Sequence, residues 1–187
     1  MIELEPGYIF STPGSGIAGW ASRTLLKPHT SRFHYGLVGD YVPEEDDYTI
    51  LESITSRGIT VGRLSFYPER DLEVYRLKDP ELRKRGHDAT LALTKYGRAP
   101  YDYLLILKLF VGALVCFWRQ ICKGQLPHAI WYWRLPYAHN SRYLCTEAAS
   151  EAFELLGIQI TPIKGAAPLP AAFQHALDFR ILEKVWP

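Results

Sequence analysis

The chain has 187 residues, of which 48% are hydrophobic and 22% are charged, and its formal net charge is +1. This composition excludes a disordered chain, and the near-zero net charge argues against a nucleic-acid-binding protein that works through a broad basic surface. The length fits one domain that buries a sizeable core. We therefore predict a single domain over residues 1–187 and no nucleic-acid partner.

The cysteines and the N-terminus bear on the compartment. There are three cysteines, an odd number with no close pair, which favours a reducing compartment over a disulfide framework. Residues 1–7 lack the basic start and the apolar core of a secretory signal. We therefore expect a cytoplasmic protein.

Two neighbouring strands, over residues 32–39 and 48–54, are predicted to carry the first polar site. Alternation places His34 on the same face as Gly36, and it places Glu52 between two isoleucines. A carboxylate buried without a partner costs several kcal/mol, so Glu52 requires a partner or a cleft. If the two strands form a hairpin, the imidazole and the carboxylate come together.

The other elements complete an α+β pattern. A helix is predicted to begin after the capping Asp79 and to run towards Tyr96, and another covers residues 168–177. Further strands are predicted over residues 7–10, 59–66, 72–77, 158–163 and 179–185.

Residues 103–122 are strongly apolar. Their uninterrupted apolar part, 109–118, is well short of the ~20 residues needed to span a bilayer. We interpret the segment as a buried core helix, and the alternative is a membrane-surface element with peripheral membrane association. An aromatic band beyond it suits an interface or a substrate groove: Trp118, Trp131, Tyr132, Trp133 and Tyr137.

Residues 141–153 are predicted to form a turn that runs into a helix, with Cys145 in its first turn. A thiol there lies near the positive end of the helix dipole and near unpaired backbone N–H groups, and both favour the reactive thiolate. The plain alternative is that Cys145 is a small apolar residue of the core. Cys116 and Cys122 belong to the apolar segment and are predicted to be structural.

Nucleophilic thiol chemistry needs a thiolate, a base that shares its proton and a group that orients the base. Cys145, His34 and Glu52 supply one of each, and such triads are defined by geometry and not by chain order. His128 and His139 are eleven residues apart without a companion ligand at metal spacing. We therefore expect neither a metal ion nor a cofactor.

Four segments, in order, resemble the circularly permuted papain-like cysteine peptidases: residues 4–10, 33–38, 50–53 and 143–148. These peptidases are the YiiX/YaeF-type branch of the NlpC-type superfamily and are related to the lecithin retinol acyltransferase group. In that family a Pro-Gly turn, a His-x-Gly strand, a strand with a glutamate and a Cys-Ser-Glu-Leu-Val helix follow one another. Here the helix motif is Cys-Thr-Glu-Ala-Ala, and the usual Pro-Gly-Asp start is Pro-Gly-Tyr; both changes leave the chemistry intact.

The resemblance implies a permuted papain-like α+β fold, in which an antiparallel sheet packs against helices and the nucleophile lies at a helix N-terminus. It also implies that Cys145 is the nucleophile, His34 the general base and Glu52 the orienting acid. Tyr143, together with the Cys145 backbone N–H, would contribute to an oxyanion site.

Three functions remain open on this basis. The first is a cysteine amidase or peptidase that forms a thioester acyl-enzyme from a cell-wall-type peptide or another amidated acyl group. The second is a thiol acyltransferase or lipase-like enzyme whose segment 103–122 recruits lipid. The third is a non-catalytic binding module with the same fold. The aromatic, proline-rich stretch 125–140 departs from the family pattern and leaves the substrate class open.

Overall fold

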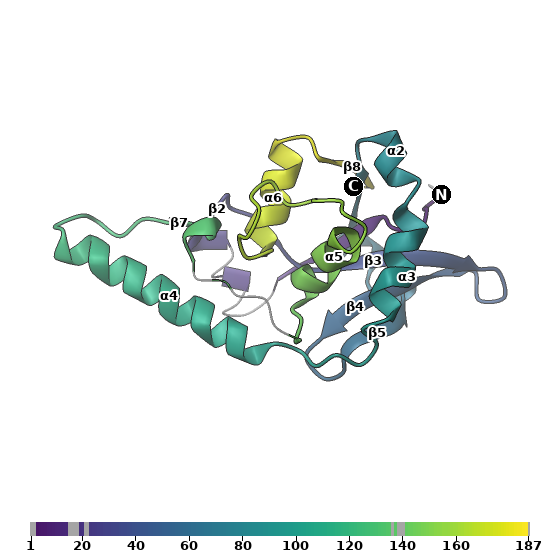
Figure 1. Cartoon of the computed structure of the whole chain (residues 1–187), viewed down its shortest axis with the longest axis horizontal. Coiled ribbons are helices and arrows are strands. Elements are labelled where there is room, and N and C mark those ends of the chain that lie inside the picture. The colour runs from purple at the N-terminus through teal and green to yellow at the C-terminus, as the bar shows by residue number, and fades with distance from the viewer. Residues whose placement is uncertain (1–2, 15–18, 21–22, 136, 138–140, 187) are drawn as a thin grey trace.

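A computed structural model of the chain describes residues 3–14, 19–20, 23–135, 137 and 141–186 (Figure 1). Its centre is a six-stranded antiparallel sheet in the order β5-β4-β3-β1-β6-β8. These strands are β1 Ile9–Pro13, β3 Arg32–Val42, β4 Asp47–Ile54, β5 Gly58–Arg63, β6 Glu73–Leu77 and β8 Leu182–Trp186. Two short strands, β2 Leu26–Lys27 and β7 Ile130–Trp131, form a separate parallel pair.

The helices complete an α+β architecture, as predicted. They are α2 Pro80–Arg83, α3 Gly86–Thr94, α4 Tyr103–Cys122, α5 Cys145–Glu154 and α6 Pro170–Asp178, with 3-10 turns η1 Leu64–Phe66, η2 Glu69–Asp71 and η3 Tyr132–Arg134. Helix α5 lies against β3, β4 and α3. Its face of small residues, Ala148, Ala149 and Ala152, is fully buried and lets the helix approach the sheet closely.

The helix predicted to run from Asp79 towards Tyr96 is in fact two helices, α2 and α3. Asp79 does cap α2, because its carboxylate accepts the Glu81 N–H at 2.8 Å. The break comes at residues 84–85, just before Gly86, which begins α3 and lies directly on the turn at residues 6–7. A Cβ at Gly86 would lie 2.2 Å from the Pro6 carbonyl oxygen, so this close packing requires glycine.

Two predicted strands are also corrected. Residues 158–163 form no strand, although Ile158 and Ile160 are buried in the core. The alternating isoleucines pack in the core, but the backbone around them does not pair with a neighbouring strand. The strand predicted over 59–66 ends at Arg63, where the chain turns into η1.

The prediction that residues 103–122 form a buried core helix is wrong in one respect. The segment is helical throughout, but within α4 only Leu105, Leu109 and Ala113 are buried. Figure 1 shows α4 running along one side of the molecule and extending beyond the sheet. By length and composition α4 is long and apolar enough to cross a membrane. The sequence pattern could not reveal the exposure of α4, because a helix that is apolar all round has the same pattern whether protein or lipid covers it.

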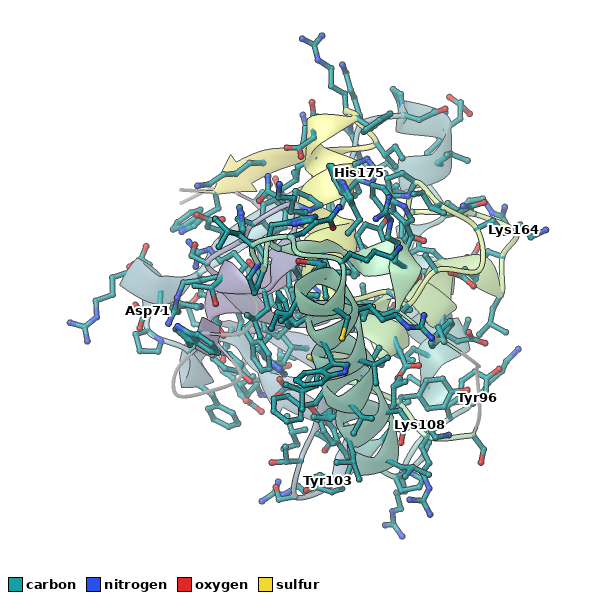
Figure 2. The ribbon with its side chains drawn as sticks, turned by 90° about the vertical axis from the view of Figure 1, so that its left-hand side faces the viewer. Asp71, Tyr96, Tyr103, Lys108, Lys164 and His175 are labelled. Carbon is teal, nitrogen blue, oxygen red and sulfur yellow. The ribbon has the colours of Figure 1, made fainter. Side chains whose placement is uncertain are left out.

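The aromatic band divides into two parts. Tyr132 is fully buried, and Trp133 stacks between Trp131 and His175 with ring centroids 4.4 Å and 5.4 Å away. These rings hold β7 and η3 against α6, where Figure 2 labels His175. Trp118 on α4 is instead 67% exposed. Most of the band is therefore packing, and only Trp118 remains on the open surface of α4.

Glu147 joins the start of α5 to its surroundings. Its carboxylate accepts the Leu144 N–H at 2.7 Å, which caps the helix, and the side chain is almost fully buried. Burial raises the pKa of Glu147 to about 7. Hydrogen bonds from the Leu144 N–H and the Tyr137 hydroxyl lower this pKa, but their effect is smaller than that of burial. The nearby Asp102 carboxylate raises the pKa further.

This raised pKa predicts a loss of stability as the pH rises. Between the ordinary carboxyl pKa of about 4.3 and the folded value near 7, the folded chain binds a proton that the unfolded chain has released. Stability present at low pH is therefore lost as the pH rises through 7, by up to roughly 3 kcal/mol. Glu147→Gln, which mimics the protonated acid, should flatten this dependence.

The measurement is the melting temperature from about pH 4 to about pH 8, which includes both pKa values. Glu154→Gln, at an exposed position near the end of the same helix, serves as the control and should follow the wild-type curve. Parallel curves for Glu147→Gln and the wild type would show that Glu147 does not titrate in this range.

Candidate active site

The β3–β4 hairpin brings His34 and Glu52 together. In its register Gly36 lies opposite Glu52, and the His34 Nε2 atom lies 2.5 Å from a Glu52 carboxylate oxygen. Close packing at Gly36 requires glycine, because a Cβ there would lie 2.5 Å from the Phe10 ring and 2.8 Å from the Leu51 carbonyl oxygen. The His34 and Glu52 side chains are 19% and 6% exposed, so the pair is largely shielded from water.

Cys145 is the first residue of α5, and the preceding Leu144 is its N-cap. The sulfur lies 3.7 Å from the Phe33 carbonyl oxygen, on the strand that carries His34, and Cys145 is close enough to the imidazole to raise the pKa of His34. Because the buried face of α5 packs on β3 and β4, the start of the helix lies over the His34 end of the hairpin. The sulfur, the imidazole and the carboxylate therefore meet at one place.

The protonation state of His34 is set by opposing effects. Burial lowers the pKa of His34, but hydrogen bonds to Cys145 and Glu52, together with the negative charge of both groups, raise it to about 10. The imidazole therefore stays protonated at neutral pH. A protonated imidazole beside a cysteine at a helix start is an environment that favours reactive thiolates.

Tyr67 is a member of the site that sequence analysis missed. Its hydroxyl donates to the same Glu52 oxygen at 2.5 Å and lies 3.1 Å from His34 Nε2. Its ring packs 5.3 Å from that of Phe10, which in turn meets His34 edge-on. Burial and the bond to Glu52 raise the pKa of Tyr67, so it stays a donor.

No motif marked Tyr67, because it lies beyond the predicted strand 59–66 and in none of the four resembling segments. The turn η1 carries the chain back so that Tyr67 covers the His34–Glu52 pair. The sequence signal was limited to an aromatic residue just before Pro68.

Tyr143, expected at an oxyanion site, is placed as a packing residue. Its ring lies 5.3 Å from that of Tyr96 in the core, and burial with the nearby Glu151 carboxylate raises the pKa of its hydroxyl to about 12. Its carbonyl oxygen accepts the Ser53 hydroxyl at 2.7 Å. These contacts fix the chain two residues before the cysteine.

An apolar pocket opens at Cys145, with a volume of about 470 Å³. Its wall beyond the cysteine comes mainly from α4, the β2 region and the start of α6. The lining includes Leu26, Phe33, Tyr103, Leu107, Phe110, Leu135, Leu169 and Pro170. A volume of this size falls within the ~300–1,000 Å³ typical of small-molecule sites. The sulfur is therefore accessible from a cavity suited to an apolar group.

Among the described residues, no group of three or more His, Cys, Asp or Glu side chains is arranged to hold a metal ion.

No family model and no curated protein matches this sequence. Its structure is similar to the crystal structure of yiiX from Escherichia coli O157:H7, which is described as a metalloprotein. The TM-score is 0.51 at 14% sequence identity, and the match covers 97% of this chain and 88% of that chain. The likeness is one of fold, it spans nearly the whole chain, and it agrees with the YiiX-like resemblance of the sequence.

Proposed function

We propose that this protein is a cysteine-dependent acyl hydrolase with a circularly permuted papain-like architecture. Cys145 is the nucleophile, His34 exchanges protons with it and with the leaving group, and Glu52 orients the imidazole. The observation that carries the proposal is the meeting of these three side chains at the start of a buried helix. Independent structural causes would rarely bring a thiol, an imidazole and a carboxylate together in this way.

The reaction follows from the positions of the groups. The Cys145 thiolate attacks the acyl carbonyl carbon and forms a C–S bond, and the resulting oxyanion lies near the N-terminus of α5, where backbone N–H groups favour negative charge. The His34 imidazolium gives its proton to the departing amine or alcohol, which leaves a thioester. Water then attacks the thioester carbonyl carbon while His34 takes up its proton; the C–S bond breaks, which releases the free acid and restores the Cys145 thiolate beside the His34 imidazolium.

The pocket favours an apolar acyl group as the substrate. A polar cell-wall-type peptide would leave its amide groups unpaired against the apolar wall, whereas a hydrocarbon chain would bury its surface there. Of the two enzymatic alternatives, the one acting on lipid or acyl substrates therefore has the better support. An amide or an ester of an apolar acyl chain fits the site.

Tyr67 acts here as a positioning residue. Its hydroxyl holds the Glu52 oxygen that faces His34, so the carboxylate cannot rotate away from the imidazole. A fixed orienting group keeps the base in one geometry throughout the two proton transfers.

Thiol labelling tests the nucleophile directly. At neutral pH, Cys145 should react with iodoacetamide at least about tenfold faster than the exposed Cys122, because the adjacent imidazolium favours the thiolate. Labelled peptides are quantified by mass spectrometry. His34→Ala should remove this advantage, and a Cys145 rate no higher than that of Cys122 in the wild-type chain would support the non-catalytic binding module.

A chain-length series tests the substrate class. With p-nitrophenyl esters from acetyl to octanoyl, kcat/KM should rise roughly fourfold per methylene group, since each buried CH₂ contributes about 0.8 kcal/mol. Cys145→Ala should abolish turnover of the whole series while leaving the fold intact, because a smaller residue fits the same position. A kcat/KM independent of chain length would favour peptide substrates over apolar acyl substrates.

Replacing the orienting acid tests the role of Glu52. Glu52→Gln removes a negative partner of His34, so the pKa of His34 should fall from about 10 towards its ordinary value. We expect kcat to fall about 100-fold with some activity retained. NMR titration of the His34 imidazole and the pH profile of kcat measure the two effects. Glu45→Gln, which removes an exposed carboxylate paired with Arg63, is the control. An unchanged rate would make Glu52 a structural residue.

A further inference from the structure

The outer face of α4 is apolar along its whole length. The helix packs on the domain through Leu105, Leu109 and Ala113, and a surface helix normally presents polar side chains on the opposite side. Here that side carries exposed apolar residues at three- and four-residue spacing: Leu104, Leu107, Val111, Leu114, Val115 and Trp118. We call this set the α4 outer face. A continuous apolar face of this kind marks an interaction surface.

The way α4 is attached favours an orientation in the plane of a membrane over a transmembrane one. Its buried residues form one cluster with Ile130, Leu135, Leu144 and Leu169, so residues 105–113 of the helix lie lengthwise on the domain. A helix attached in this way cannot cross a bilayer without drawing the polar domain in with it. The α4 outer face can instead lie in the plane of a membrane surface.

Charge also distinguishes this part of the chain. Residues 103–146 contain no aspartate or glutamate, yet they contain Lys108, Arg119, Lys123, Arg134 and Arg142. Because the whole chain is nearly neutral, the remainder carries a net negative charge. Such an asymmetry favours contact with an anionic surface on the α4 side.

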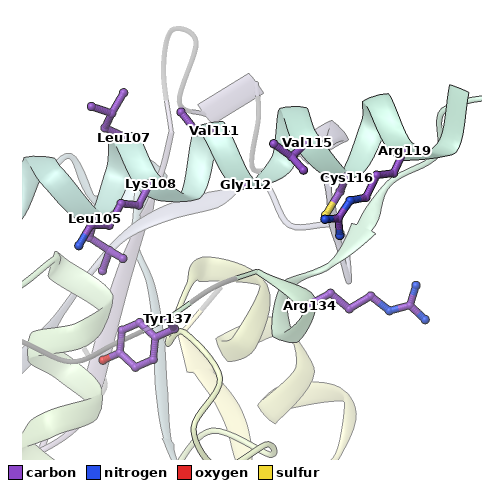
Figure 3. Close-up of a pocket in the computed structure, with 10 residues that line it drawn as sticks. All are labelled: Leu105, Leu107, Lys108, Val111, Gly112, Val115, Cys116, Arg119, Arg134 and Tyr137. Atoms are coloured by element: carbon purple, nitrogen blue, oxygen red, sulfur yellow. The ribbon is translucent and has the colours of Figure 1, made fainter. Parts of the chain in front are cut away.

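The cations lie beside the apolar face. A hollow of about 740 Å³ next to α4 is lined by Lys108, Arg119 and Arg134 together with apolar residues of the outer face (Figure 3). In Figure 3, Lys108 and Arg119 project from the helix, and Arg134 extends from η3 beneath it. Cationic groups flanking an apolar helix face suit phospholipid head groups above acyl chains.

The pocket at Cys145 is continuous with this surface. Tyr103, Leu107 and Phe110 line the pocket, and each is about half exposed on α4. Viewed along the helix, α4 stands in front of the sheet, with Tyr103 and Lys108 at its lower part (Figure 2). A hydrocarbon chain in contact with α4 would therefore reach the sulfur along apolar side chains, without crossing water.

We infer that α4 docks in the plane of an anionic phospholipid bilayer, with its outer face among the acyl chains and its cations at the head groups. We infer also that the bilayer supplies the acyl substrate of Cys145. The second statement rests on the proposed function, whereas the docking does not.

Vesicle flotation of the full chain tests the docking. Binding to vesicles of phosphatidylcholine and phosphatidylglycerol should exceed binding to phosphatidylcholine alone by at least about tenfold. Leu114→Glu combined with Trp118→Glu should lower binding at least about tenfold, because charge enters the outer face while the pocket lining is untouched. Leu91→Glu is the matched control, since Leu91 on α3 is 50% exposed and Leu114 is 52% exposed.

Two further variants keep the result interpretable. Cys145→Ala should float as the wild type does, so a failure of the chemistry and a failure of docking give different results. Lys123→Glu, at the exposed end of α4, should weaken the preference for phosphatidylglycerol without touching the apolar face. This test remains available if the double variant does not fold.

Activity assays distinguish delivery of the substrate from the membrane from the reaction at Cys145. The double variant should hydrolyse a short soluble ester at the wild-type rate, but it should hydrolyse an acyl lipid in vesicles at least about tenfold more slowly. Four outcomes would overturn the inference: no flotation of the wild type, equal binding to neutral vesicles, resistance to alkaline carbonate extraction, or a dimer in solution that Leu114→Glu dissociates.

Discussion

The structure depends above all on the contact between His34 and Glu52. A carboxylate that is 6% exposed would cost several kcal/mol without a partner, and here it meets both an imidazole and the Tyr67 hydroxyl. The contact exists because the register of the β3–β4 hairpin, with Gly36 opposite Glu52, brings the imidazole and the carboxylate together. Two residues of two strands, His34 and Glu52, and one residue after a following turn, Tyr67, thus form one polar cluster.

Helix α5 serves packing and chemistry with different parts of the same segment. Its alanine face enters the core and fixes the helix against the hairpin, and this packing alone determines where the first turn, with Cys145, comes to lie. Glu147 and Leu144 close that first turn with a buried hydrogen bond. The position of the sulfur is therefore fixed by core packing, as the proposed reaction with its two proton transfers requires.

Helix α4 obeys a different constraint. It contributes few residues to the core, yet it walls the pocket at Cys145 and presents an apolar face outward. Exposing such a face to water is unfavourable. In a chain of ordinary composition, an exposed apolar face of this kind indicates a surface that binds a partner. The same helix would then bind the membrane and guide the substrate. The exposed apolar face of α4 would thus lead to the Cys145 thiol.

The sequence by itself determined the α+β pattern, the shared face of His34 and Glu52, and the helix that begins at Cys145, because strand and helix periods are local properties. Only the tertiary structure decided that Tyr67 joins the site, that the helix after Asp79 breaks just before Gly86, and that α4 is largely exposed. Each of these depends on which distant segment packs on which, and a local period carries no information about that choice.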